Sequence, residues 1–219
     1  MTRKSGLGLL AAALIAMGGL WMTAERGALS PFGAAEAQTA DADLPEVPDL
    51  VLGEDDAPVT VIEYASYTCP HCATFHQNVF KPLKADYIDT GKIQFIYREV
   101  YFDRFALWAA MVARCGGENR YFGISEMLYE QQRDWAGSND AGTVIGNLRR
   151  IGRTAGLGED QLNACLEDAD MAQAMVAKFQ AETQADDINA TPSLVINGQK
   201  HSNMSYAQLS GIIDGLLAD

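Results

Sequence analysis

The sequence is poor in basic residues and in histidine. It contains 16 Lys and Arg residues against 29 Asp and Glu, a formal net charge of -13, and only 3 histidines. Such an acidic surface repels phosphate backbones and anionic lipids, so nucleic-acid binding is not expected. The sequence also contains no internal repeat.

The N-terminal segment has the pattern of a bacterial secretory signal. A basic pair, Arg3-Lys4, precedes an uncharged apolar stretch, Gly6 to Met22, and small residues then end in Ala35-Glu36-Ala37. We expect cleavage after this tripeptide and export to the periplasm. A retained membrane anchor is the alternative, because 17 apolar residues lie at the lower edge of what spans a bilayer. Removing residues 1–37 takes away three basic and two acidic residues, so the net charge becomes -14.

Cysteine is scarce, but two of the four cysteines lie close together. Cys69-Pro70-His71-Cys72 directly follows a β-branched apolar run, Val59 to Ala65, and directly precedes apolar residues at helical spacing. Two thiols separated by two residues can close a disulfide on themselves. A strand that leads into a helix places the first thiol at the positive end of that helix. The pattern therefore favours a redox-active pair.

The order of predicted elements indicates an α/β fold with a helical insertion. Residues 38–49 predict a flexible lead-in, with an edge strand at Val51 or Leu52. The other expected elements are strands at 59–65, 93–100, 193–196 and 199–202, and helices that begin at the cysteine pair and at residue 206. Pro82 should kink or restart the first helix. We expect one domain from residues 50–102 and 186–219 and an all-helical domain inserted at 103–185.

The cysteine motif, together with Thr191-Pro192 just before the late hairpin, resembles the DsbA family of exported thiol:disulfide oxidoreductases. The resemblance covers roughly residues 47–219. It implies a thioredoxin-like domain with an inserted helical domain, the architecture that the element order suggested independently. It also implies catalysis without a cofactor or a metal, by a monomer that oxidises newly exported cysteine-containing proteins and is reoxidised by a quinone-linked membrane protein.

By this resemblance Cys69 is the exposed attacking thiol and Cys72 the buried resolving thiol. The physics supports this order, because free backbone N–H groups point only at the N-terminal sulfur. A strong oxidant needs the pKa of Cys69 to fall from ~8.5 to ~4.5. The helix dipole supplies at most ~2 kcal/mol of this stabilisation, and hydrogen bonds and the side chain of His71 would supply the rest. The alternative for His71 is a solvated residue without an electronic role.

The resemblance also gives roles to two further sites. In thioredoxin-like folds a cis proline lies beside the active disulfide, and Thr191-Pro192 matches it; a trans turn is the alternative. The backbone of Thr191 would pair with an extended substrate chain, and its hydroxyl could tune the sulfurs. Glu63 matches a buried acid that accepts the proton of the resolving thiol, although an edge-strand residue facing water would fit the sequence equally.

The remaining cysteines are Cys115 and Cys165, each on the apolar stripe of its own predicted helix. Closure of the local pair leaves these two to form a structural disulfide, which resembles a subset of the family. The alternative is a pair of buried free thiols.

Two rival functions stay open at this point. A metal-binding module would use Cys69, Cys72 and His76, although it needs more ligands than these. A disulfide isomerase or reductase would use the same cysteines, but exported isomerases usually carry a dimerisation domain for which this chain has no room. Covalent haem is excluded, because Ala73 stands where the haem motif requires histidine.

Overall fold

A computed structural model describes residues 44–218. The predicted signal segment, 1–37, and the first half of the lead-in, 38–43, lie outside the described residues. The described chain is built on a five-stranded sheet in the order β1-β3-β2-β4-β5. Its strands are β1 (Leu50–Leu52), β2 (Val59–Ala65), β3 (Ile93–Glu99), β4 (Ser193–Ile196) and β5 (Gln199–Ser202). The central strands β2 and β3 run parallel, and the other pairings are antiparallel.

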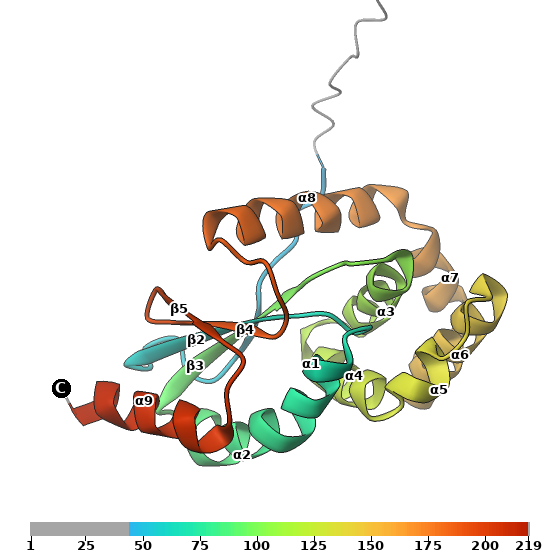
Figure 1. Cartoon of the computed structure of the whole chain (residues 1–219). Helices are drawn as coiled ribbons and strands as arrows, with labels where there is room; N and C mark the ends of the chain where they lie inside the picture. The colour runs from blue at the N-terminus through green and yellow to red at the C-terminus, as the bar shows by residue number, and fades with distance from the viewer. Residues whose placement is uncertain (1–43, 219) are drawn as a thin grey trace, which may run out of the picture. The chain divides into compact units, whose positions relative to one another are not determined.

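Helices cover both faces of this sheet. They are α1 (Pro70–Phe75), η1 (His76–Phe80), α2 (Lys81–Leu83), η2 (Lys84–Ile88), α3 (Arg104–Cys115), α4 (Glu118–Glu130), α5 (Gln132–Ala136), α6 (Ala141–Thr154), α7 (Glu159–Glu167), α8 (Ala169–Ala185) and α9 (Tyr206–Ala218). Figure 1 shows α8 on one face of the sheet and α2 and α9 on the other. The expected α/β class and the helical insertion between β3 and β4 are therefore confirmed.

Strand β2 is buried on both faces, which explains its nearly continuous apolar sequence. Alternate residues of a strand share a face, so Val59, Val61 and Glu63 point to the same side. The two valines are fully buried in the main core. Tyr64 points to the other side, where it packs with Val195 in a small cluster below α8.

The first helix is interrupted around Pro82, as the sequence predicted. Two π-helical segments, η1 and η2, flank the short α2 that contains this proline. The backbone N–H of Lys81 donates to the carbonyl of His76, five residues earlier, instead of four. Pro82 cannot donate and its ring crowds the preceding turn, so a widened turn accommodates it without ending the helix.

Helices α3 to α7 form a block beside the sheet. Asp103 begins the block as the N-cap of α3, and its carboxylate accepts hydrogen bonds from the backbone N–H groups of Phe105 and Ala106. Trp135 of α5 is fully buried and donates from its ring nitrogen to the carbonyl of Leu128 at 2.7 Å. The expected insertion thus consists of a helical block followed by α8, which returns to the sheet.

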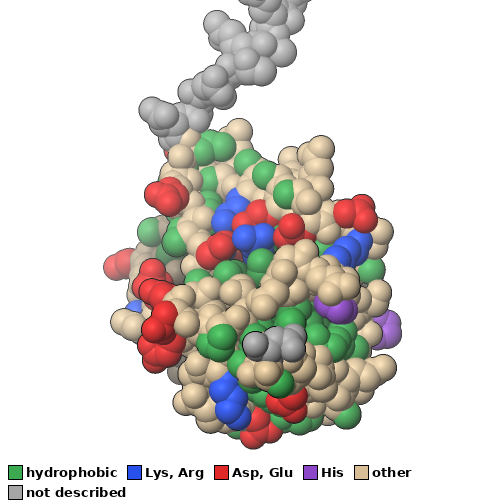
Figure 2. Space-filling view, turned by 90° about the vertical axis from the view of Figure 1, so that its left-hand side faces the viewer, with side chains coloured by type: hydrophobic (Ala, Val, Ile, Leu, Met, Phe, Trp, Pro, Cys, Tyr) green, Lys and Arg blue, Asp and Glu red, His purple; other side chains and the backbone are tan. Residues whose placement is uncertain are grey.

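Ion pairs fasten α8 to the sheet. Glu182 of α8 lies 3.2 Å from the guanidinium of Arg98 on β3, and Lys178 lies 2.8 Å from Asp49 in the lead-in. Figure 2 views the side of the molecule that lies at the left of Figure 1, and there Lys and Arg side chains have Asp and Glu side chains beside them. This face therefore offers no open basic patch. Within residues 44–218, no helix has the length and apolar character needed to cross a membrane.

Candidate functional site

The reactive cysteine pair begins at the point where the loop after β2 enters α1. Cys69 is the N-cap residue of this helix, with extended φ and ψ of -81° and 118°. Its carbonyl accepts hydrogen bonds from the backbone N–H groups of Cys72 and Ala73 at 3.1 and 3.2 Å. Pro70 occupies the first helical position, where no N–H is needed and its fixed φ suits the helix. The sequence thus places the Cys69 sulfur at the positive end of α1.

Burial separates the two thiols, both of which are free in the structure. Cys69 is partly exposed, whereas Cys72 is fully buried. A hydrogen bond from the Cys72 thiol lowers the pKa of Cys69 to about 5, against partial burial, with help from the backbone N–H groups of Cys72 and His71. Burial raises the pKa of Cys72 far above its ordinary value, and the hydrogen bond to Cys69 raises it further. One thiol of the pair is therefore acidic and the other is not.

The Thr191–Pro192 peptide bond is cis and lies beside this pair. The Thr191 carbonyl is 3.6 Å from the Cys69 sulfur. The Thr191 hydroxyl oxygen is buried and has no hydrogen-bond partner among the described residues. Ser193, the first residue of β4, donates from its hydroxyl to the carbonyl of Ala190 at 2.7 Å and so fixes the loop that carries this peptide.

Comparison with known proteins agrees with this geometry. Residues 46–215 match the family model described as Thioredoxin. A putative protein-disulfide oxidoreductase of Rickettsia typhi is 36% identical over 78% of the chain and 63% of its own length. Disulfide bond formation protein D of Bacillus subtilis is 30% identical over 75% of each chain. The crystal structure of Wolbachia pipientis alpha-DsbA1 is 31% identical, with a TM-score of 0.73 over 80% of this chain and 94% of that one.

The chain belongs to the DsbA family of thioredoxin-like proteins. The predicted resemblance is therefore confirmed, and so is the thioredoxin-like fold with a helical insertion. The chain spans slightly less than two thirds of the length of the Rickettsia relative.

Glu63 of this DsbA family member lies inside the sheet and not at its edge. It is 1% exposed, and the strand register places it beside Tyr97 of β3. Arg98 lies beside Tyr64 in the same register, and therefore on the opposite face of the sheet. Arg98 cannot be the basic partner of Glu63.

The buried carboxyl of Glu63 has no ion-pair partner in the described chain. Its Oε2 atom also lacks a hydrogen-bond partner there. Burial raises the pKa of Glu63 to about 8. When it is ionised, Glu63 also helps to raise the pKa of Cys72, after burial and the bond to Cys69, so the acid lies near the resolving thiol. Its role in proton transfer stays a prediction.

His71 lies exposed at the start of α1, next to the exposed Pro70. The hydrogen bond from the Cys72 thiol contributes most to lowering the pKa of Cys69, and the backbone N–H of His71 is one of the further donors. The residue therefore acts on the sulfur through its main chain. An electronic role of its imidazole ring stays a prediction.

The structure does not assemble the alternative metal site around His76. This residue is 3% exposed, and its ring lies 4.6 Å from the ring of Phe80 and 4.9 Å from that of Tyr129. Burial lowers the pKa of His76 to about 4. Across the part of the chain that the structure describes, no three His, Cys, Asp or Glu side chains are grouped to hold an ion. His76 is a core residue of the first helix.

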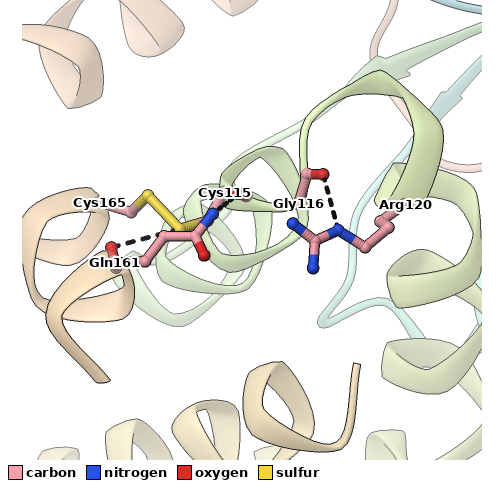
Figure 3. The surroundings of a disulfide bond; sticks show 5 residues. All are labelled: Cys115, Gly116, Arg120, Gln161 and Cys165. Carbon is pink, nitrogen blue, oxygen red and sulfur yellow. Dashed lines mark hydrogen bonds between the residues drawn. A yellow bond between two sulfur atoms is a disulfide. The ribbon is translucent and has the colours of Figure 1, made fainter. Parts of the chain in front are cut away.

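The second cysteine pair is joined in a disulfide within the helical block. Cys115 ends α3 and Cys165 lies on α7, with their Cα atoms 5.8 Å apart. Gln161 of α7 donates from its side-chain amide to the carbonyl of Cys115 at 2.8 Å (Figure 3). Arg120 of α4 donates to the neighbouring carbonyl of Gly116 at 3.2 Å, so three helices meet at this bond (Figure 3).

Sequence reasoning missed Gln132, which reaches the reactive loop from the helical block. This first residue of α5 is 6% exposed, and its amide nitrogen donates to the carbonyls of Tyr67 at 2.8 Å and Cys69 at 2.9 Å. Its position is 63 residues after Cys69. No motif marks a glutamine at that distance, so only the folded chain reveals the contact.

A buried polar network also holds the side chain of Tyr67 in the same loop. The hydroxyl of Tyr67 donates to that of Tyr121 at 2.7 Å, and Tyr121 donates to Glu99 at 2.8 Å. Glu99 in turn forms an ion pair with Arg114 of α3 at 2.8 Å. Charges this well buried require such partners, so the network fixes Tyr67 against the helical block.

Proposed function

We propose that this protein is a periplasmic thiol:disulfide oxidoreductase that donates a Cys69–Cys72 disulfide to cysteine-containing polypeptides. One observation carries the proposal. The hydrogen bond from Cys72, with other donors, lowers the pKa of Cys69 to about 5, whereas Cys72 beside it is fully buried. An acidic thiol is a good leaving group, so a disulfide that contains it is readily exchanged.

The acidity of Cys69 favours the reduced form of the pair. The gap between a pKa of about 5 and pH 7 corresponds to ~2.7 kcal/mol, at ~1.36 kcal/mol for each pH unit. Solvent screening at this partly exposed sulfur reduces the gain to roughly 2 kcal/mol. In a two-electron couple this equals ~40 mV. The disulfide form is therefore the one that gives up its bond.

The reaction proceeds in two exchanges. A substrate thiolate attacks the Cys69 sulfur, the bond to Cys72 breaks, and a mixed disulfide joins Cys69 to the substrate. A second substrate thiolate then attacks the substrate sulfur of that bond, and Cys69 leaves as a stable thiolate. The substrate loses two electrons and gains a disulfide, and the protein gains two electrons as its dithiol.

Neighbouring groups assist each exchange. Cys72 leaves inside the protein, where burial raises its pKa, so it must take up a proton. Glu63, whose pKa burial raises to about 8, is protonated at neutral pH and can supply that proton. The backbone of Thr191, 3.6 Å from the Cys69 sulfur at its carbonyl, can pair with an extended substrate chain.

The cycle also needs an oxidant, because each turnover leaves the dithiol. A quinone-linked membrane protein facing the periplasm would accept these electrons. The signal pattern of residues 1–37 supports export to that compartment, where disulfides form.

Trapping the intermediate tests this function. Oxidised wild-type protein should introduce disulfides into a reduced, unfolded client faster than glutathione disulfide does. The variant Cys72→Ser, first activated at Cys69 as a mixed disulfide with 5-thio-2-nitrobenzoate, should exchange the aromatic thiol for a thiol of the reduced client and accumulate a Cys69–client disulfide, whereas Cys69→Ser treated in the same way should form none. A parallel assay on a scrambled client measures isomerase activity. Equal adducts in both variants, or no client oxidation by the wild type, would refute the proposal.

A further inference from the structure

The reactive loop receives a side chain from the helical block at the residue that carries the sulfur. We propose that Gln132 is a positioning residue for the redox reaction: it holds the loop that presents Cys69, so the helical block helps to set the reactivity of the pair. This inference rests on the proposed function, which by itself assigns the helical block no part in the chemistry.

The contact is specific for an amide donor. The Gln132 nitrogen lies 2.8 Å from the Tyr67 carbonyl and 2.9 Å from the Cys69 carbonyl. Among the described residues, no other donor reaches the Tyr67 carbonyl. The Cys69 carbonyl also accepts the first N–H groups of α1, so Gln132 binds the same oxygen that begins the helix. One side chain therefore fixes both the loop and the helix start.

The amide is held rigidly. Trp135 is fully buried one turn further along α5, and its backbone N–H donates to the carbonyl of Gln131 at 3.1 Å. Gln132 itself is 6% exposed, so its rotamer is packed as well as hydrogen-bonded. A buried carbonyl that loses its donor is strongly penalised, and the loop would shift to reach another. Such a shift moves the Cys69 sulfur relative to the N–H groups of His71 and Cys72 that stabilise its thiolate.

The neighbouring Gln131 provides a matched control. It is the same residue type one position earlier, but its side-chain oxygen accepts a hydrogen bond from Arg150 at 3.4 Å, away from the cysteine pair. Gln131→Met makes the same change in side-chain shape and polarity as Gln132→Met does. It leaves both loop carbonyls with their donor.

The experiment titrates the thiolate of reduced, full-length protein by its ultraviolet absorbance, with the second disulfide intact. Gln132→Met should raise the midpoint by about one pH unit and shift the glutathione equilibrium about tenfold toward the disulfide, which equals ~30 mV. Gln131→Met should change neither. Thermal unfolding of each variant is measured in parallel, because a purely structural role would lower only the melting temperature.

The outcomes separate this inference from the proposed function. A wild-type midpoint near that of a free thiol would refute the proposed function. An acidic wild-type midpoint that Gln132→Met leaves in place, or moves no more than Gln131→Met does, would refute the positioning role alone. Should Gln132→Met not fold, as judged by circular dichroism, Gln132→Asn replaces it. Asparagine keeps the donor but shortens its reach, so a smaller shift in the same direction is expected, and no shift would overturn the inference.

Discussion

The two cysteine pairs of this protein contain the same atoms in opposite surroundings. Cys69 and Cys72 lie at the start of one helix, where donors lower the pKa of the first and burial raises that of the second. Cys115 and Cys165 lie 50 residues apart and are joined between two helices. The first pair is arranged so that its reduced form is stable, and the second so that its bond holds the fold. Cysteine reactivity is therefore decided by neighbouring N–H groups and by burial.

Removing the second disulfide should have the largest effect on stability. In the double variant Cys115→Ala/Cys165→Ala, the unfolded chain is no longer restrained by a closed loop of about 50 residues and gains entropy. The chain-entropy model predicts that this lowers the free energy of unfolding by ~4 kcal/mol. Urea unfolding measures this loss. Client oxidation should continue, since the reactive pair is intact. If the double variant were as stable as the wild type, the disulfide would have no stabilising role.

Replacing Glu63 tests the buried acid below the reactive pair. Its folded pKa, raised by burial to about 8, lies above the ordinary 4.5. The contribution of Glu63 to the free energy of unfolding is therefore fully present below pH 4.5. It is lost as the pH rises toward 8, because the unfolded chain releases the proton first. Glu63→Gln should abolish this slope and stabilise the protein at pH 7 by roughly 3 kcal/mol.

Urea unfolding at pH 5 and pH 8 checks this result for wild type and variant. Client oxidation by Glu63→Gln should also slow, because Cys72 loses its proton donor. Parallel pH profiles for the two proteins would contradict the buried, protonated carboxyl.

Reduction of the Cys69–Cys72 pair should have a smaller effect, which is a change in how the free energy of unfolding depends on pH. Donors led by the Cys72 thiol depress the folded pKa of Cys69 from 9.0 to about 5. In the reduced protein, the contribution of the Cys69 thiolate to the free energy of unfolding is fully present above pH 9.0. It is lost as the pH falls through about 5. Between pH 5 and pH 7 the reduced form should gain roughly 2 kcal/mol relative to the oxidised form, after allowance for solvent screening. Unfolding curves of both redox forms measure this gain. A constant difference across that range would speak against an acidic Cys69.

The sequence predicted most of the fold because its signals are local. The β-branched run predicted β2, the strands expected at 193–196 and 199–202 are β4 and β5, and Pro82 marked the disturbed helix. The position of α8 on the sheet was not predicted. It depends on ion pairs of Lys178 and Glu182, and on packing of Phe179 against Tyr101, with residues far away in the chain, which no periodicity reveals.

The candidate site divides in the same way. The cysteine motif could be recognised in the sequence because the strand, the loop and the helix that position it follow one another directly. Glu63 could not be placed from its sequence neighbours, since only the sheet order shows whether β2 is central or at an edge. Gln132 carries no signal at all, because its hydrogen bonds join residues 63 and 65 positions apart.

Titration of Cys69 in the reduced wild-type protein tests the central claim most directly. With Cys115 and Cys165 still bonded, only two thiols can ionise, and burial keeps Cys72 protonated across the accessible range. The thiolate absorbance should rise by one equivalent with a midpoint near pH 5, because the Cys72 thiol and further donors lower the pKa of Cys69 to about 5. A midpoint near ~8.5, the value of an ordinary cysteine, would contradict the account.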